Sequence, residues 1–269
     1  TEIRLENAEV AENSDGAVIA RLSVVDSNRG DTHSFTISDD RFEVVDGEVR
    51  LKPGVSLDHE EAATVTLEVT ATDSGGLSVT ESFTIAVLDV NEGPTAVEFE
   101  ASAIAENESG AQVGRLTVVD PDAGDTHSLT VSDERFEVVD GIVRLKPGVA
   151  LDFEDASTIS FEVTVTDSGG RSLTENFEVV VSDVNEGPES VTLDTSPVAE
   201  NAEGAFVGQL SVVDPDAGDS HTFTLSDDRF EVIDGEVRLK PGVSLDHEEA
   251  ASISIDVTET ARGGLSVTE

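Results

Sequence analysis

The stretch RFEVVDG occupies Arg41 to Gly47, recurs at Arg135 to Gly141, and returns as RFEVIDG at Arg229 to Gly235. The copies are offset by 94 residues each time, and a fixed long period is typical of an array of similar domains. The Asp-Gly pair at the end of each phrase predicts a β-hairpin, because both residues tolerate the positive φ that a two-residue turn requires. The array is therefore expected to consist of β domains.

A second phrase, DVNEGP, marks the ends of the first two copies at Asp89 to Pro94 and Asp183 to Pro188. The predicted modules are residues 1–94, 95–188 and 189–269, called repeats 1, 2 and 3 below. Repeat 3 fills 81 of the 94 positions and has no counterpart of the last strand and linker. We expect it to have an open sheet edge and to be the least stable repeat. The chain opens with neither Met nor a signal peptide, which predicts an excerpt of a longer protein.

Apolar and polar residues alternate within each repeat, as in Thr64 to Ala71, and this period of two predicts strands that are buried on one face. Further strands are expected at Ala17–Val25, at His33–Ile37, at Leu77–Leu88 and before Glu12. About seven strands per repeat fit an all-β fold of tandem immunoglobulin-like, antiparallel Greek-key sandwiches in a linear array. No stretch has a convincing helical period, which argues against a βαβ nucleotide-binding fold.

The composition excludes several classes of function. With 58 acidic and 15 basic residues the net charge is −43, which opposes contact with nucleic acid. The absence of Cys rules out disulfides and thiolate metal sites, and the absence of Trp and Tyr argues against the aromatic platform of a glycosidase. No apolar run reaches the ~18 residues of a membrane span. We expect no enzyme activity.

Five short acidic phrases recur at strand ends or loops. In repeat 2 they are Glu106-Asn107, Asp120-Pro121-Asp122, Asp152-Phe153-Glu154, Asp167 and Asp183-Val184-Asn185-Glu186. A single carboxylate in a loop is usually no more than a solvated side chain. Five phrases in a fixed order, repeated along the chain, are a far more specific signal.

These phrases resemble those of the cadherin family in its bacterial form, and the resemblance covers the whole chain. In that family an xEN phrase, an LDxE phrase and a DxNDNxP linker come from one module, and the next module contributes a DxD phrase and a later lone Asp. The resemblance implies that these groups together hold up to three Ca²⁺ ions at each junction between modules.

Transferred by position, the resemblance implies ligands at two junctions. Those of the first junction would be Glu12, Asp58, Glu60, Asp89, Asn91, Glu92, Asp120, Asp122 and Asp167. Those of the second would be Glu106, Asp152, Glu154, Asp183, Asn185, Glu186, Asp214 and Asp216.

The second junction departs from the family pattern, because Ala261 stands where repeat 2 has Asp167. Its third ion is therefore in doubt, and Glu259, two residues earlier on the same strand face, is one candidate for a partial replacement. Repeat 1 has Asp26-Ser27-Asn28 in place of the DxD phrase. Both linkers also carry Glu and Gly where the family usually has Asp and Asn, at Glu92-Gly93 and Glu186-Gly187.

The chemistry of the predicted ligands suits calcium. Ca²⁺ takes about 6 to 8 hard oxygen ligands from carboxylates, amides and carbonyls, whereas transition metals favour imidazole or thiolate. Two carboxylates ~6 Å apart repel by roughly 0.7 kcal/mol in water and by more when partly buried. Clustered carboxylates without cations should therefore push the repeats apart, and calcium should stiffen the junction.

Histidine offers a weaker signal. His33, His127 and His221 recur in the phrase GD-[TS]-H, one to a repeat, and a turn or edge role is expected for them. His59 and His247 occupy the position of Phe153, which favours packing or exposure over chemistry.

The function implied by the resemblance is that of a secreted or membrane-anchored bacterial surface adhesin, in which calcium stiffens the junctions for cell adhesion. The partner would be the same or another surface protein. Extracellular calcium modules bind with dissociation constants of about 10⁻⁴ to 10⁻³ M, which suits a location outside the cell. Two alternatives stay open, namely a passive spacer array and accessory modules of a large secreted toxin or enzyme.

Overall fold

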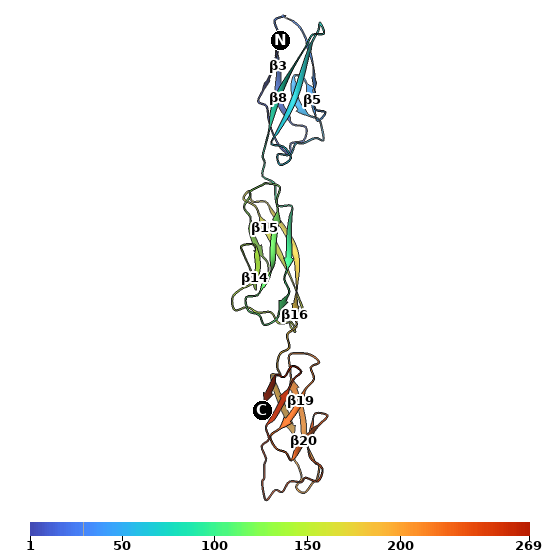
Figure 1. The fold of residues 1–269 in the computed structure, drawn as a ribbon, viewed down its shortest axis with the longest axis vertical. Coiled ribbons are helices and arrows are strands. Elements are labelled where there is room, and N and C mark those ends of the chain that lie inside the picture. The colour runs from blue at the N-terminus through green and yellow to red at the C-terminus, as the bar shows by residue number, and fades with distance from the viewer. Residues whose placement is uncertain (29) are drawn as a thin grey trace. The chain divides into compact units, whose positions relative to one another are not determined.

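The computed structural model describes residues 1–28 and 30–269, and each regular element among them is a β-strand (Figure 1). Over the same residues there is no helix of the length and apolarity needed to cross a membrane. Repeat 1 contains β1 (Glu2–Glu6), β2 (Glu9–Ala11), β3 (Val18–Val25), β4 (His33–Ile37), β5 (Phe42–Val45), β6 (Glu48–Leu51), β7 (Thr64–Asp73) and β8 (Ser78–Leu88). The expected strands are thus present.

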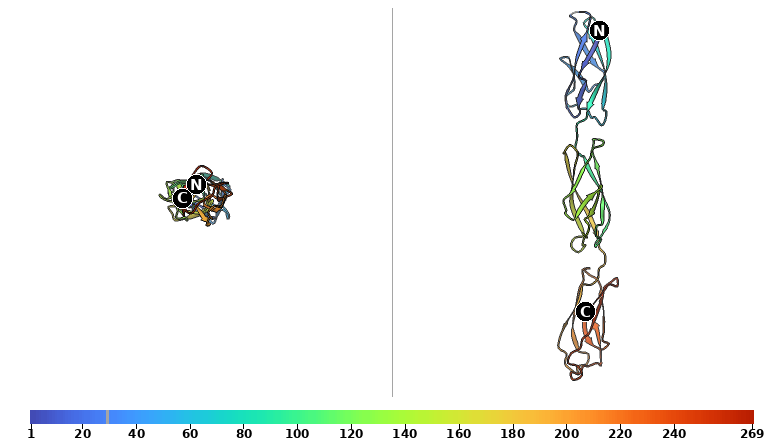
Figure 2. Two further views of the ribbon diagram at one scale, coloured as in Figure 1. Left: turned by 90° about the horizontal axis from the view of Figure 1, so that it is seen from below. Right: turned by 90° about the vertical axis from the view of Figure 1, so that its left-hand side faces the viewer.

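Repeats 2 and 3 contain corresponding strands. Those of repeat 2 are β9 (Ala96–Ala101), β10 (Ile104–Ala105), β11 (Gln112–Val119), β12 (Ser128–Val131), β13 (Phe136–Val139), β14 (Ile142–Leu145), β15 (Thr158–Thr166) and β16 (Ser172–Ser182). Those of repeat 3 are β17 (Ser190–Thr195), β18 (Phe206–Val213), β19 (Thr222–Leu225), β20 (Phe230–Ile233), β21 (Glu236–Leu239), β22 (Val257–Thr260) and β23 (Ser266–Thr268). Figure 2 shows these strands from two further directions.

The chain forms two compact units. Unit 1 consists of Thr1–Glu100, Leu116–Ser132 and Glu162–Asn176, and unit 2 consists of Ala101–Arg115, Asp133–Phe161 and Phe177–Glu269. Both units therefore draw on repeat 2, and the module boundaries at residues 94 and 188 stay a prediction. The first linker and its predicted metal ligands all belong to unit 1. The second linker and its predicted ligands all belong to unit 2.

Unit 1 contains the sandwich of repeat 1. One of its sheets has the order β1-β3-β6-β5 and the other has the order β2-β8-β7-β4, so the chain passes repeatedly between the two. The pairing of β2 with β8 is parallel, with Val10 opposite Val87, which differs from the antiparallel expectation. The opening segment forms two strands, β1 in one sheet and β2 in the other, and β2 joins the edge beside the last strand.

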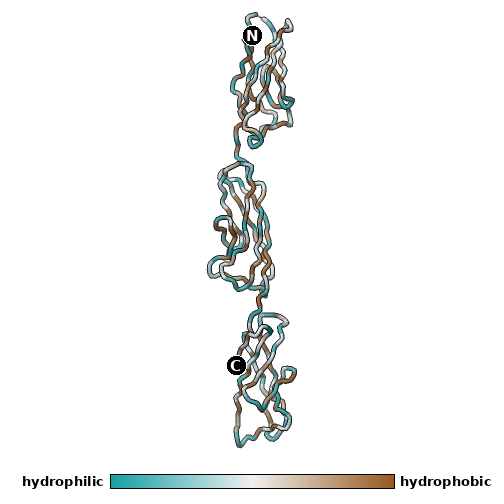
Figure 3. The backbone as a smooth tube through the Cα atoms, viewed as in Figure 1, coloured by the Kyte–Doolittle hydropathy of each residue, from teal (hydrophilic) through white to brown (hydrophobic). Residues whose placement is uncertain are grey.

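The core of repeat 1 comes from the inward face of both sheets. Ile3, Leu22 and Val49 point inward from one sheet, and Leu67 and Ile85 do so from the other, all at most 7% exposed. Figure 3 shows the alternation that produces this core as brown and teal along the strands. The alternation of apolar and polar residues in the sequence therefore matches the alternation of buried and exposed side chains along the strands.

The RFEVVDG phrase forms a hairpin with an anchored start. Asp46 and Gly47 have φ values of 53° and 78°, as a two-residue turn between β5 and β6 requires. Before the hairpin, the Arg41 guanidinium donates to both oxygens of Asp39 and lies 5.8 Å from the ring centroid of Phe42. The hydrogen bonds from Arg41 lower the pKa of Asp39. The ion pair between Arg41 and Asp39 therefore lies against the ring of the buried Phe42.

Unit 2 contains repeat 3, with sheets of order β17-β18-β21-β20 and β19-β22-β23 over its described residues. Val191, Leu210, Val237 and Leu239 are buried between them. Within the repeat 2 part of this unit, β13 pairs with β14, β10 pairs in parallel with β16, and Phe136 lies 5.2 Å from Phe161 between ring centroids. The same strand pairings thus recur along the chain.

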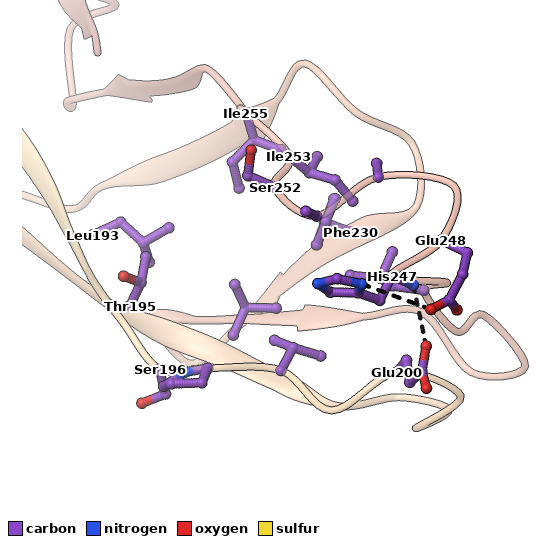
Figure 4. Close-up of a pocket in the computed structure, with 16 residues that line it drawn as sticks. Leu193, Thr195, Ser196, Glu200, Phe230, His247, Glu248, Ser252, Ile253 and Ile255 are labelled. Carbon is purple, nitrogen blue, oxygen red and sulfur yellow. Dashed lines mark hydrogen bonds and ion pairs between the residues drawn. The ribbon is translucent and has the colours of Figure 1, made fainter.

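A groove of about 750 Å³ opens in repeat 3 where the other repeats have their last strand (Figure 4). Leu193, Ile253 and Ile255 line it and are half-buried. In repeat 1, Val65 and Leu67 occupy the positions of these two isoleucines and are 8% and 0% exposed, because β8 pairs along them. Residues 253–255 therefore pack less closely than their counterparts in repeat 1, and the extent of repeat 3 stays a prediction.

The groove predicts unequal stability between repeats. We expect the amides of residues 253–255 to exchange with solvent faster than those of residues 65–67, because residues 65–67 pair with β8 and residues 253–255 lie outside the strands. Hydrogen–deuterium exchange followed by mass spectrometry would measure the difference. Equal protection of the two segments would contradict the prediction.

Candidate metal centres

Each candidate centre contains a buried glutamate, Glu12 at the first linker and Glu106 at the second. Glu12 is 2% exposed and follows β2 at the end of the sandwich. Its Oε2 accepts the His59 amide at 2.7 Å and its Oε1 accepts the Val90 amide at 2.8 Å. The xEN, LDxE and linker phrases therefore meet at this one carboxylate, which fixes the loop and the linker relative to each other.

Carboxylates from the repeats before and after the first linker lie close together around it. Oxygens of Glu12, Glu60, Asp89 and Asp122 lie within 4.8 Å of one another. Asp122 also accepts the Glu92 amide at 2.6 Å, and Asn13 donates to the Glu92 carboxylate at 2.6 Å. Residues of repeats 1 and 2 thus share one cluster of carboxylates around the linker.

A second cluster in unit 1 lies beyond the linker. Oxygens of Asp120, Asp125 and Asp167 lie within 4.8 Å of one another. Asp167 is 6% exposed, and its Oδ2 accepts the side-chain amide of Asn91 at 2.9 Å. The linker asparagine therefore reaches the lone Asp of repeat 2.

Asp125 is a residue that the sequence reasoning missed. It belongs to the GD-[TS]-H phrase, whose recurrence was attributed to the histidine alone. His127 lies immediately before β12, and its Nε2 lies 2.7 Å from Asp120 Oδ2. The phrase therefore brings both an acid and an imidazole to the first aspartate of the DxD phrase. The recurrence of Asp31, Asp125 and Asp219 was the signal that could have identified the acid.

The second linker repeats this arrangement within unit 2. Oxygens of Glu106, Glu154 and Glu186 lie within 4.8 Å of one another, and so do those of Glu154, Asp183 and Asp216. The buried Glu106 accepts the Phe153 and Val184 amides at 2.7 and 2.8 Å. Asn185 donates to the Glu186 carbonyl oxygen at 2.6 Å. Asn91 makes the equivalent contact to the Glu92 carbonyl oxygen and donates to Asp167 as well.

Crowding shifts the proton affinity of several of these groups. Burial, followed by the charges of nearby carboxylates, raises the pKa of Glu60, Glu154 and Asp183. Burial also acts to raise the pKa of Asp167, but hydrogen bonds from Asn91 and from backbone amides outweigh it, and the pKa is lowered. The clusters therefore hold negative charge that is poorly compensated by protein donors.

Two predicted ligands have a capping role as well. Asp58 Oδ1 accepts the Glu61 amide at 2.9 Å and Asp152 Oδ1 accepts the Asp155 amide at 3.0 Å, so each caps the turn of its LDxE phrase. His59 Nδ1 lies 2.7 Å from the Val87 carbonyl oxygen, and one ring nitrogen of His59 is within 4.8 Å of oxygens of Glu60 and Asp89. This histidine lies at the first cluster, which the packing interpretation did not foresee.

The glycine-rich turns of the next repeat pack closely on the linkers. A Cβ added at Gly169 would lie 2.1 Å from Asn91 Oδ1, and one added at Gly93 would lie 3.1 Å from Arg171 Cβ. A Cβ at Gly187 would likewise lie 3.1 Å from Leu265 Cβ. The close approach of the next repeat therefore explains why these linker positions carry glycine.

This packing predicts the effect of a single methyl group. Gly169→Ala should displace the Asn91 side chain from Asp167 and loosen the first linker, so that the amides of residues 89–94 exchange faster in hydrogen–deuterium exchange. The matched control is Gly75→Ala, at the same position of repeat 1, where a Cβ would meet the side chain of Asp73 at 3.2 Å and no linker atom. Equal exchange of residues 89–94 in both variants would contradict the prediction.

The donor groups at both linkers fit Ca²⁺. They are carboxylates and amides, which are the hard oxygen ligands that this ion prefers. Within the described part of the chain, Asp122 Oδ1 and Asp125 Oδ2 in unit 1, and Asp214 Oδ2 and Asp219 Oδ2 in unit 2, are buried without a hydrogen-bond partner. Buried acceptors without donors are costly, and a bound cation would satisfy them.

Known proteins share this fold and part of this sequence, although no known family profile matches the chain. Chimpanzee protocadherin alpha-2 is 31% identical over 194 residues, which are 64% of this chain and 20% of that protein. Human protocadherin beta-1 is 28% identical over 244 residues, covering 81% of this chain and 30% of that protein. The chain thus spans less than a third of either relative.

Solved structures extend the similarity to almost the whole chain. Mouse cadherin-23 EC22–24 superposes with a TM-score of 0.73 at 18% identity, covering 99% of this chain and 96% of that one. The repeats of this chain are cadherin-like. The extracellular cadherin domains 1–4 of protocadherin gamma B7 give the same TM-score at 23% identity, covering 98% of this chain and 72% of that one. The resemblance to the cadherin family is therefore confirmed, and its bacterial form stays a prediction.

Proposed function

We propose that the chain binds Ca²⁺ at the linkers between its cadherin-like repeats, and that it belongs to the extracellular part of a secreted or surface-anchored adhesion protein. The observation that carries the proposal is the cluster of Glu12, Glu60, Asp89 and Asp122, whose oxygens converge from both sides of the first linker. A cation bound there would connect the repeats through ligands that otherwise repel one another.

The electrostatics of the clusters support a cation of high charge. Burial and neighbouring carboxylates raise the pKa of Glu60 and Glu154, so the ionised forms lack sufficient compensation from the protein. A divalent ion would supply that compensation at both linkers. Mg²⁺ suits these sites less well, because it demands near-octahedral geometry and loses its water reluctantly.

The adhesive role rests on the similarity to protocadherins and cadherins. One solved neighbour is described as a cis-dimer of protocadherin gamma B7 domains EC3–6. By analogy, the partner of this chain would be another copy or a second surface protein. Calcium at the linkers would then fix the orientation in which a repeat is presented to that partner.

Counting the bound ions tests the calcium proposal. Equilibrium dialysis against radioactive calcium should show that Asp167→Ala binds one ion fewer than the unaltered chain, because Asp167 belongs to the Asp120 and Asp125 cluster. The matched control is Asp194→Ala, which removes an exposed carboxylate from β17 and should leave the count unchanged. No bound calcium in the unaltered chain, or an equal count in all three proteins, would refute the proposal.

A further inference from the structure

Glu259 is a buried carboxylate on a strand where the other repeats have small or apolar side chains. It lies on β22 and is 0% exposed. Its position corresponds to Ala71 in repeat 1 and to Val165 in repeat 2, both of which are buried. A buried carboxylate destabilises a fold unless it is paired, so a compensating group is required here.

The protein compensates Glu259 in part. His221 Nδ1 lies 2.9 Å from Glu259 Oε1 and 3.9 Å from Asp214 Oδ2, so two carboxylates approach the same ring nitrogen. Within the described residues, Glu259 Oε2, Asp214 Oδ2 and Asp219 Oδ2 are buried without a hydrogen-bond partner. One imidazole therefore faces more negative charge than it can neutralise.

The same region of repeat 2 has a different distribution of acids. There Asp120 and Asp125 correspond to Asp214 and Asp219, and they form a cluster with Asp167. His127 approaches Asp120 through Nε2, whereas His221 presents Nδ1 to Glu259. Repeat 3 has Ala261 at the position of Asp167, so a third acid is lost from the turn and gained two residues earlier on the strand.

We propose that Glu259 replaces this lost aspartate, and that it forms with Asp214 and Asp219 a divalent cation site at the second linker. The inference rests on the proposed calcium binding and specifies a ligand for it. Two residues along a strand are ~6.6 Å, and they share a face. The proposed site at the second linker therefore keeps three acids, as the Asp120, Asp125 and Asp167 cluster does at the first.

The repeats supply a variant that separates this role from a structural one. Glu259→Val introduces the side chain that repeat 2 carries at Val165, so the sandwich should fold. It should bind one Ca²⁺ fewer than the unaltered chain in equilibrium dialysis. The double variant Glu259→Val with Ala261→Asp recreates the pair found in repeat 2 and should restore the lost ion.

A second measurement locates the ion. Hydrogen–deuterium exchange should show that calcium protects residues 183–188 and 214–219 in the unaltered chain and in the double variant, but less in Glu259→Val. In chelator, Glu259→Val should melt at a higher temperature than the unaltered chain, because it removes a carboxylate that is incompletely paired without a cation.

The outcomes distinguish the two proposals. If Asp167→Ala loses one ion and Glu259→Val loses none, calcium binding stands and the role of Glu259 is overturned. A lower melting temperature of Glu259→Val in chelator, with an unchanged ion count, would identify a structural pair with His221 and would also overturn it. If the unaltered chain binds no calcium, the proposed function itself fails, and the inference falls with it.

Discussion

Removal of calcium by a chelator is expected to change the solution behaviour of the chain more than any single substitution. Eight carboxylates are predicted to surround the first linker, and charges about 5 Å apart repel by about 0.8 kcal/mol per pair even at the dielectric constant of water. Without cations this repulsion should free the linkers from one preferred conformation. Small-angle X-ray scattering should then show a broader distribution of interatomic distances than in the calcium-bound chain.

Two controls separate specific binding from screening. Raising the ionic strength in chelator weakens repulsion between exposed charges, but it should restore only part of the calcium effect, because the buried acceptors stay without ligands. Mg²⁺ at the same concentration should also restore less than Ca²⁺. Identical scattering with and without calcium would show that these ions do not stiffen the linkers.

Glu106→Ala is expected to be among the most damaging substitutions of one carboxylate. It would remove the acceptor of two part-buried hydrogen bonds, from the Phe153 and Val184 amides, at a cost of up to about 1–3 kcal/mol for each donor. These hydrogen bonds form within the protein and do not involve calcium. Part of the loss of stability should therefore persist in chelator. Thermal unfolding of the full chain, with and without calcium, would measure both parts.

Repeat 3 provides the matched control for this substitution. Glu200 occupies the position of Glu106, yet it is exposed, and its Oε2 accepts the His247 amide at the longer distance of 3.3 Å. Glu200→Ala should therefore leave the melting temperature almost unchanged. Equal losses from the two variants would show that the bridging hydrogen bonds of Glu106 contribute little.

Much of the fold could be predicted because its signals are local. The Asp46-Gly47 turn and the strand at His33–Ile37 are determined by neighbours in sequence, and both lie where expected. The parallel pairing of β2 with β8 could not be anticipated in this way, since Val10 and Val87 are far apart in the chain. Their contact depends on how the opening segment divides between the two sheets.

The candidate centres show the same contrast. The linker phrases and the position of Glu12 could be picked out from a repeated order of acids, but the burial of Glu12 required the fold. The approach of Asn91 to Asp167 and the pairing of His221 with Glu259 join residues that are distant in sequence and have no shared motif. The position of Glu259 could be noted in the sequence, but its burial and its unpartnered oxygen required the fold.

The net charge of −43 also governs how copies of the chain meet one another. At low ionic strength it keeps them apart. Salt weakens this repulsion between exposed charges, so encounters between copies should become more frequent as the salt concentration rises.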